Sequence, residues 1–179
     1  MPIIQNQLNT DNSPWYKIME ERAITWDEFA KENNLIVEGF YNANIVTFEV
    51  KTYKLNLFGI RQVSNVTSLS IFSMGSISEE LNIKISTPIN SSKNYIRIRK
   101  RSFLNLFRKQ LKNRIRYNNY HITCQEETIF NDLKKLGILS FKKIKKLTIN
   151  KKGVKLVLFE LPHDTSVIES FIKYCNNLA

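Results

Sequence analysis

The sequence predicts an α+β fold: an N-terminal helix, an antiparallel meander of about five strands, an amphipathic basic helix, a C-terminal hairpin and a closing helix. Apolar residues repeat at helical spacing before residue 34, and they alternate with polar residues over much of 35–100. Alternation returns on both sides of a Lys-Lys-Gly turn near residue 152. The 179 residues are 42% apolar, enough to form one core. We therefore expect a flexible arm over 1–12 and a single domain over 13–179.

The N-terminal helical region has two possible starting points. Ser13 before Pro14 is typical of a helix cap followed by proline in the first turn. Thr25 and Glu28 have the spacing of a second capping box, with Trp26 on the apolar face that follows. The helical pattern ends near the "KENN" segment.

Residues 35–100 have the alternation and the β-branched content of strands. The segment "NIVTFEVKTYKLNLF" alternates in period two, with Val46 and Phe48 on one face and Thr47 and Glu49 on the other. Gly59 suits a turn before the next strand, "IRQVSNVTSLSIF". The strand "LIVEGFY" begins the predicted meander, and two further strands, "LNIKIST" and "NYIRIRK", complete it.

The second half of the chain mixes helices and strands. Apolar residues at helical spacing predict a helix over 103–113 whose other face is basic. The strand "YHITC" follows, then short helices over 126–135 and about 137–145, and then the hairpin. Asp164 or Thr165 caps the closing helix.

Four large aromatic residues and both cysteines are expected in the interior. The aromatic residues are Trp26, Phe48, Phe107 and Phe171. The two cysteines, Cys124 and Cys175, are far apart and lack the spacing of a metal or redox motif, so they are expected to be buried, reduced thiols.

Two segments resemble a widespread group of uncharacterised bacterial proteins. "WDEFAKENNL" matches their helix pattern W-x-x-F-A-x-x-N-x-L, and "VEGFY" matches the V-x-G-x-Y strand that follows it. The run from "YHITC" through the hairpin to the closing helix is similar to their second half. The resemblance covers roughly residues 25–178. It implies an α+β fold and no activity.

Positive charge is concentrated in one part of the chain. The formal net charge is +11, and the window from Leu81 to Gln125 contains eleven Lys and Arg but no Asp or Glu. Abundant Lys, Asn and Ile are also expected of an AT-rich genome, so lysine alone carries little functional information. Arginine is more informative, because six of the eight arginines lie between Arg97 and Arg116 and guanidinium groups suit bidentate contact with phosphate or carboxylate.

The sequence therefore predicts a non-enzymatic binding or assembly module that docks an acidic protein surface or a macromolecular complex. The alternatives are a solvated face without a partner, a nonspecific RNA- or DNA-binding protein and a peripheral membrane-surface module. The predicted basic face consists of Arg97, Arg99, Lys100, Arg101, Arg108, Lys109, Lys112, Arg114 and Arg116. Possible stacking residues for nucleic-acid bases are Tyr95, Tyr117 and Tyr120.

Signatures of catalysis and of cofactor binding are missing from the sequence. No phosphate-binding glycine loop or nucleophile elbow occurs, and two histidines, His121 and His163, are too few for a site with several His ligands. His163-Asp164 is better interpreted as the start of a helix than as a metal motif. We expect no catalytic residue, cofactor or metal. The N-terminal segment has no secretory signal pattern, so a cytoplasmic protein is expected.

Overall fold

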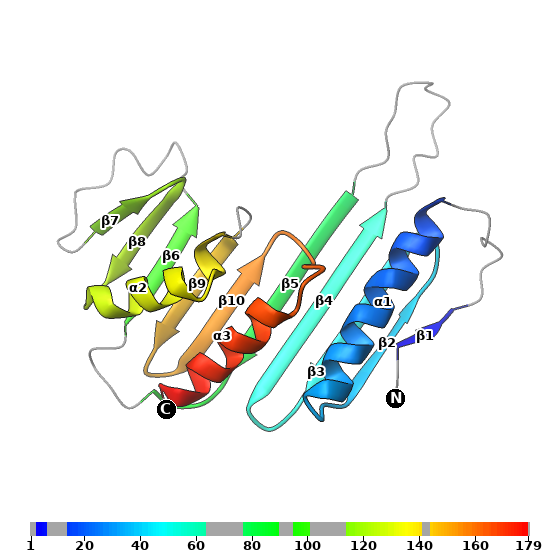
Figure 1. Ribbon diagram of the computed structural model, residues 1–179, viewed down its shortest axis with the longest axis horizontal. Coiled ribbons are helices and arrows are strands. Elements are labelled where there is room, and N and C mark those ends of the chain that lie inside the picture. The colour runs from blue at the N-terminus through cyan, green and yellow to red at the C-terminus, as the bar shows by residue number, and fades with distance from the viewer. Residues whose placement is uncertain are drawn as a thin grey trace, which may run out of the picture. The chain divides into compact units, whose positions relative to one another are not determined.

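The computed structural model describes residues 3–6, 14–63, 77–89, 95–100, 114–140 and 144–178 (Figure 1). These residues form ten strands, three α-helices and one short 3-10 helix, so the fold is α+β. A meander of about five strands is therefore too small a count. The predicted helix over 103–113 lies outside the described residues, and so does Phe107.

The chain divides into two compact units. Unit 1 contains residues 1–82 and 159–165, and unit 2 contains residues 83–158 and 166–179. The domain that we expected over 13–179 thus comprises two compact units, and the chain visits unit 1 a second time between the last strand and the last helix.

Unit 1 combines one helix, α1 (Pro14–Glu32), with a mixed sheet. Its strands, in order across the sheet, are β1 (Ile3–Gln5), β2 (Val37–Tyr41), β3 (Ile45–Lys51), β4 (Leu55–Val63) and the first part of β5 (Ile77–Ile85). The β1 strand runs parallel to β2, whereas β2, β3 and β4 are antiparallel neighbours. Residues 3–5, which we placed in a flexible arm, are therefore paired, and the antiparallel pairing of β2, β3 and β4 agrees with the prediction.

The α1 helix runs through the second predicted start without a break. The Thr25 hydroxyl donates a hydrogen bond to the backbone oxygen of Glu21, at 2.9 Å, one turn earlier in the same helix. This bond satisfies the hydroxyl inside the helix, so Thr25 is not a cap. The helix ends at Glu32, and Asn34 adopts the left-handed conformation (φ 53°) common just after a helix.

Stacked aromatic rings form the core of unit 1. The Trp26 ring stacks on Phe48 with centroids 4.8 Å apart, and Phe29 meets Trp26 edge-on at 5.3 Å. Gly59 lies opposite Phe48 within β4, where an added Cβ would lie 2.1 Å from the Phe48 Cζ atom. Gly59 thus makes room for the ring, and the predicted turn at this residue is wrong. The core positions of Trp26 and Phe48 are confirmed.

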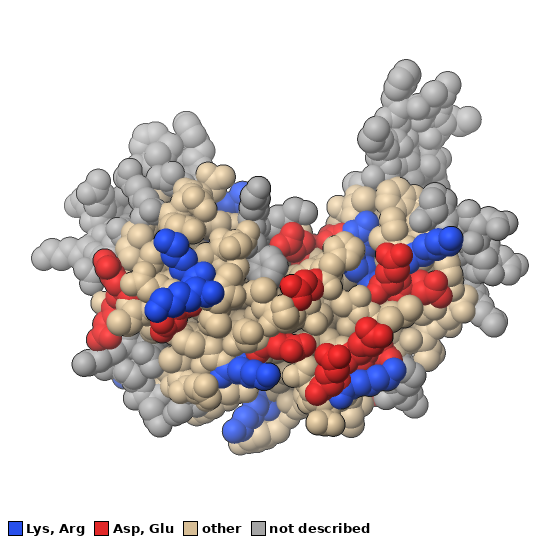
Figure 2. Space-filling view, viewed as in Figure 1, with Lys and Arg blue, Asp and Glu red and all other residues tan. Residues whose placement is uncertain are grey.

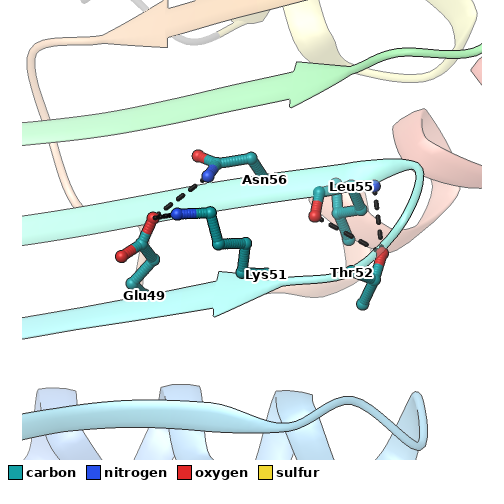
Figure 3. A network of polar contacts seen from close by, with 5 residues as sticks. All are labelled: Glu49, Lys51, Thr52, Leu55 and Asn56. Atoms are coloured by element: carbon teal, nitrogen blue, oxygen red, sulfur yellow. Dashed lines mark hydrogen bonds and ion pairs between the residues drawn. The ribbon is translucent and has the colours of Figure 1, made fainter.

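The alternating segment that we predicted as one strand is a hairpin of β3 and β4 (Figure 3). At the turn, the backbone N–H of Leu55 donates to the Thr52 hydroxyl oxygen at 3.0 Å. The Thr52 N–H donates to the Leu55 carbonyl oxygen at 2.7 Å. Beside it, the Glu49 carboxylate accepts a hydrogen bond from Asn56 at 3.0 Å and lies 3.6 Å from the Lys51 ammonium.

Unit 2 contains the helices α2 (Glu127–Lys135) and α3 (Ser166–Asn177) and the short 3-10 helix η2 (Ile138–Ser140). Its strands, in order, are the last part of β5, β10 (Gly153–Leu158), β9 (Ile144–Asn150), β6 (Ile96–Lys100), β8 (Tyr120–Cys124) and β7 (Arg114–Tyr117). The β9–β10 hairpin is confirmed, but it lies between β5 and β6, so the predicted meander does not continue into β6. The predicted helix over 137–145 is shorter than expected.

One face of the unit 2 sheet is apolar and lies under its helices (Figure 1). A continuous cross-strand row of apolar residues consists of Leu156, Leu147, Ile98, Ile122 and Ile115. Phe171 of α3 is buried, as predicted, and both cysteines are buried and free. Burial raises the pKa of the Cys175 thiol to about 12, so it stays protonated near neutral pH. We define the opposite face of this sheet as the outer face of unit 2.

Candidate binding surface

Two arginines of β6 lie on the outer face of unit 2. Arg97 and Arg99 alternate with Ile96 and Ile98, which are fully buried on the helix-covered face. Successive side chains of a strand point to opposite faces, so the two guanidinium groups share the outer face. Because β6 pairs with β8 on one side and β9 on the other, both arginines have cross-strand neighbours in two directions.

The strand register places Arg97 in a row of cationic and hydroxyl side chains. Arg97 pairs with Thr148 of β9 and Thr123 of β8, and Thr148 pairs in turn with Lys155 of β10. The backbone of Arg114 in β7 continues the row opposite Thr123. The Thr148 hydroxyl oxygen is buried and has no hydrogen-bond partner.

A second row runs through Arg99. Its neighbours are Lys146 of β9 and His121 of β8, with the backbone of Arg116 beyond His121 and Val157 of β10 beyond Lys146. We call these two sets of residues the basic rows. Cross-strand neighbours lie about 4.8 Å apart and successive positions on one face roughly 6.6–6.8 Å apart. Within the rows, Arg97, Arg99, Lys146 and Lys155 are thus brought close together on one face.

Carboxylates are absent from every described strand segment of unit 2. The sequences of β6 to β10 contain no Asp or Glu, and neither does the part of β5 that belongs to this unit. That part of β5 adds Lys84, which is exposed and alternates with buried Ile83 and Ile85. The described carboxylates of unit 2 lie on or next to its helices.

Only part of the predicted basic face coincides with these rows. Arg97, Arg99 and the β7 residues Arg114 and Arg116 fall within them. Lys100 ends β6 on the opposite face, opposite Tyr120, so its assignment to the same face as Arg99 was wrong. The other predicted members lie outside the described residues: Arg101, Arg108, Lys109 and Lys112.

The predicted stacking tyrosines do not gather on the outer face. Tyr120 is 3% exposed, and its hydroxyl accepts a hydrogen bond from the Ile144 N–H at 3.0 Å, so this residue cannot stack on a base. Tyr117 packs edge-on against Phe130 of α2 at 5.5 Å, on the helix-covered face. Tyr95 lies just before β6 and two positions before Arg97, so its side chain falls on the same side as that of Arg97. Of the three predicted stacking residues, it is the one on the outer side.

Charge is segregated between the two units. Unit 1 contains 12 Asp and Glu against 6 Lys and Arg, whereas unit 2 contains 4 against 21. The formal charges are therefore −6 and +17, which together give the +11 of the chain. Figure 2 shows carboxylates gathered over α1, where Glu21, Glu28 and Glu32 are exposed.

A second constellation, which the sequence analysis missed, is buried in unit 1. Arg22 of α1 and Arg61 of β4 are 5% and 8% exposed. Arg61 forms an ion pair with Glu79 of β5, and Arg22 donates a hydrogen bond to the Leu161 carbonyl oxygen. The Leu161 N–H donates to Glu79 at 3.0 Å, so both backbone groups of Leu161 are bound by charged side chains. We call these four residues the Leu161 clasp.

The electrostatics of the clasp follow from burial and from two like charges. Burial, and then the neighbouring Arg61, lower the pKa of Arg22 to about 10. Burial also lowers the pKa of Arg61. Lost hydration, and then Arg22 and Arg61, lower the pKa of His163, two residues beyond Leu161. The Nε atoms of both arginines are buried without a hydrogen-bond partner.

The clasp fixes the segment 159–165 in unit 1, which is a structural role. The sequence did contain a signal that Arg61 is buried, because Arg61 lies on the same face of β4 as the buried residues Leu57 and Val63. For Arg22 the corresponding signal was its spacing from Met19 and Trp26 on the buried face of α1. A charged residue in an apolar stripe indicates a buried partner, and neither sequence pattern names that partner.

Among the described residues, no group of three or more His, Cys, Asp or Glu side chains lies close enough together to hold a metal ion. None of the helices described is both long and apolar enough to span a bilayer. Comparison of the chain with protein-family models, with curated proteins and with solved structures finds no match. The resemblance drawn from "WDEFAKENNL" and "VEGFY" therefore stays a prediction.

Proposed function

We propose that the protein is a non-enzymatic binding module that docks an anionic partner on the outer face of unit 2. The observation that carries this proposal is the strand register, which brings Arg97, Arg99, Lys146 and Lys155 together from three strands without any carboxylate among them. These residues are distant in sequence, so a local cluster of basic residues does not account for their adjacency.

Like charges at this spacing repel one another, and the arrangement is tolerable only because water and counterions screen it. An anionic partner replaces the counterions and releases them, which favours binding at low salt. It also gives Arg97 and Arg99 acceptors that the described strands of unit 2 do not supply from Asp or Glu.

The test is salt elution of the full-length, nuclease-treated protein from immobilised heparin, a polyanion that carries both sulfate and carboxylate groups. The variant Arg97→Glu/Arg99→Glu changes the rows, and Lys151→Glu/Lys152→Glu makes the same change in net charge at the exposed β9–β10 turn. We expect the row variant to elute at clearly lower salt than the turn variant. Equal losses for both variants would mean that retention follows net charge, and the proposed surface would be rejected.

A further inference from the structure

The segregation of charge between the units bears on what kind of anion the outer face binds. Unit 2 carries 21 basic residues against 4 acidic ones, a far larger excess than the few carboxylates of a typical protein surface can neutralise. A partner that matches this excess must carry many negative charges close together. Nucleic acid is such a polymer, because a duplex presents one phosphate charge for about every 1.7 Å of its axis.

The dimensions of the basic rows fit that charge density. A row crosses five strands, from Lys155 of β10 to Arg114 of β7, and five strands at 4.8 Å spacing span roughly 19 Å. On the order of ten duplex phosphates lie within that length. The surface is therefore broad enough to contact several phosphates at once.

Threonine residues in the row through Arg97 support phosphate as the ligand group. Thr148 lies in register between Arg97 and Lys155, and Thr123 lies on the other side of Arg97. Threonine hydroxyls and arginine guanidinium groups are both common donors to phosphate oxygens. The Thr148 hydroxyl oxygen is buried, so Thr123, which is half-buried, is the threonine of this row that offers a hydroxyl to a phosphate.

The position of the aromatic residues indicates that bases are not read. Tyr117 and Tyr120 belong to the helix-covered face, where they pack against Phe130 and bond to the Ile144 N–H. Only Tyr95 has the parity of the outer face, so a series of stacked bases has no platform in the described strands. Contacts to the backbone alone carry no direct sequence information.

Unit 1 has the opposite character and restricts the contact to unit 2. On its sheet face away from α1, Glu38 of β2 lies directly opposite Glu49 of β3. Lys51 pairs with Glu49, but unit 1 keeps a formal net charge of −6, which repels a polyanion. The acidic unit therefore stays out of the bound interface.

From these observations we infer that the outer face of unit 2 binds the phosphate backbone of a nucleic acid, without regard to base sequence. This inference rests on the proposed function, because it names the partner of the same surface. Arg97, Arg99, Lys146 and Lys155 bind phosphates, and Thr123 adds a neutral hydrogen bond to a phosphate oxygen.

The experiment is fluorescence anisotropy of a labelled random-sequence 20-nucleotide RNA, titrated with the full-length protein between 50 and 300 mM salt, beside poly-L-glutamate of matched charge. We expect the RNA to bind more tightly at every salt concentration. Losing two phosphate contacts in Arg97→Gln/Arg99→Gln is expected to reduce the log–log salt slope by about 1.4. Thr123→Val is expected to weaken RNA binding about fivefold, whereas Thr47→Val in unit 1 leaves it unchanged.

The outcomes distinguish failure of nucleic-acid binding from failure of anion binding in general. Binding of poly-L-glutamate as tight as that of the RNA would overturn the inference and leave the proposed function standing, with an acidic protein as the partner. Failure of both polymers to bind at 50 mM salt would overturn the two proposals together. RNA binding that persists with an unchanged salt slope in the double arginine variant would place the interface elsewhere.

Discussion

Two pairs of arginines, Arg22 with Arg61 in unit 1 and Arg97 with Arg99 in unit 2, show how position in the fold changes the role of one side chain. The first pair is buried, and its guanidinium groups bind a carboxylate and a backbone carbonyl of the same unit. The second pair lies on the outer face of a sheet whose described strands contain no carboxylate. The difference arises from parity: Arg61 shares the buried face of β4, whereas Arg97 and Arg99 alternate with buried isoleucines.

The comparison separates structural charge from binding charge. A buried ion has lost its hydration, so the fold must provide its partner, and removing that partner is costly. An outer-face charge keeps its hydration and can exchange it for a ligand. Removing a buried charge should therefore reduce stability, whereas removing an outer-face charge should mainly reduce binding.

The strongest test compares Arg61→Met with Arg99→Met. Arg61→Met leaves the Glu79 carboxylate buried without its ion pair and is expected to lower the free energy of unfolding by about 3–5 kcal/mol. Arg99→Met removes an outer-face charge and is expected to change the free energy of unfolding by less than about 0.5 kcal/mol. Urea unfolding followed by circular dichroism measures both. Equal losses for the two variants would contradict the distinction between the pairs.

A smaller effect is expected from a polar group on the helix-covered face of unit 2. Tyr120→Phe removes the hydroxyl that accepts the Ile144 N–H bond. A buried N–H without a partner costs about 1–3 kcal/mol, which the same urea experiment resolves. Tyr53, which is 93% exposed, provides the control variant Tyr53→Phe, expected to be neutral. A neutral Tyr120→Phe variant would show that the bond from the Ile144 N–H does not contribute to stability.

Thr148→Val changes an uncharged residue of the basic rows. Its buried hydroxyl has no partner, so an apolar side chain of similar shape is expected to leave stability unchanged or to raise it by up to about 1 kcal/mol. A variant that is clearly less stable than wild type would show that the hydroxyl is already satisfied in the folded protein.

The smallest effect concerns pH. In the folded protein the pKa of His163 is lowered by lost hydration and by Arg22 and Arg61, so the unfolded chain binds the proton first as pH falls. Stability is therefore expected to decrease as pH drops through 6.5 toward the lower folded pKa. His163→Gln removes this part of the dependence, whereas His121→Gln retains it. Urea midpoints at pH 7.5 and pH 5.5 make the comparison, and identical shifts in both variants would contradict it.

Much of the local structure could be predicted from the sequence. The outward orientation of Arg97 and Arg99 follows from their alternation with Ile96 and Ile98, and the Lys-Lys-Gly turn identifies the β9–β10 hairpin. The interior positions of Trp26, Phe48 and Phe171 follow in the same way from apolar spacing. These features depend on near neighbours in the chain.

Other predictions failed because a distant contact decided the outcome. Gly59 resembled a turn residue, but it is needed where the Phe48 ring crosses β4. Tyr120 resembled an exposed aromatic residue, but Ile144 brings a backbone donor to its hydroxyl. Lys100 continued a basic run in the sequence, yet it ends β6 on the other face from Arg99.

The periodic faces of the strands, the excess of positive charge and the residues that carry it can all be derived from the order of residues in the chain. The positions of β9 and β8 on either side of β6, which align Thr148, Arg97 and Thr123 in one row, depend on the folded structure. It alone also brought Arg22, Arg61 and Glu79 to Leu161. The physical reason is range: alternation is fixed by the geometry of adjacent residues, whereas strand order and buried ion pairs depend on contacts between segments up to 139 residues apart.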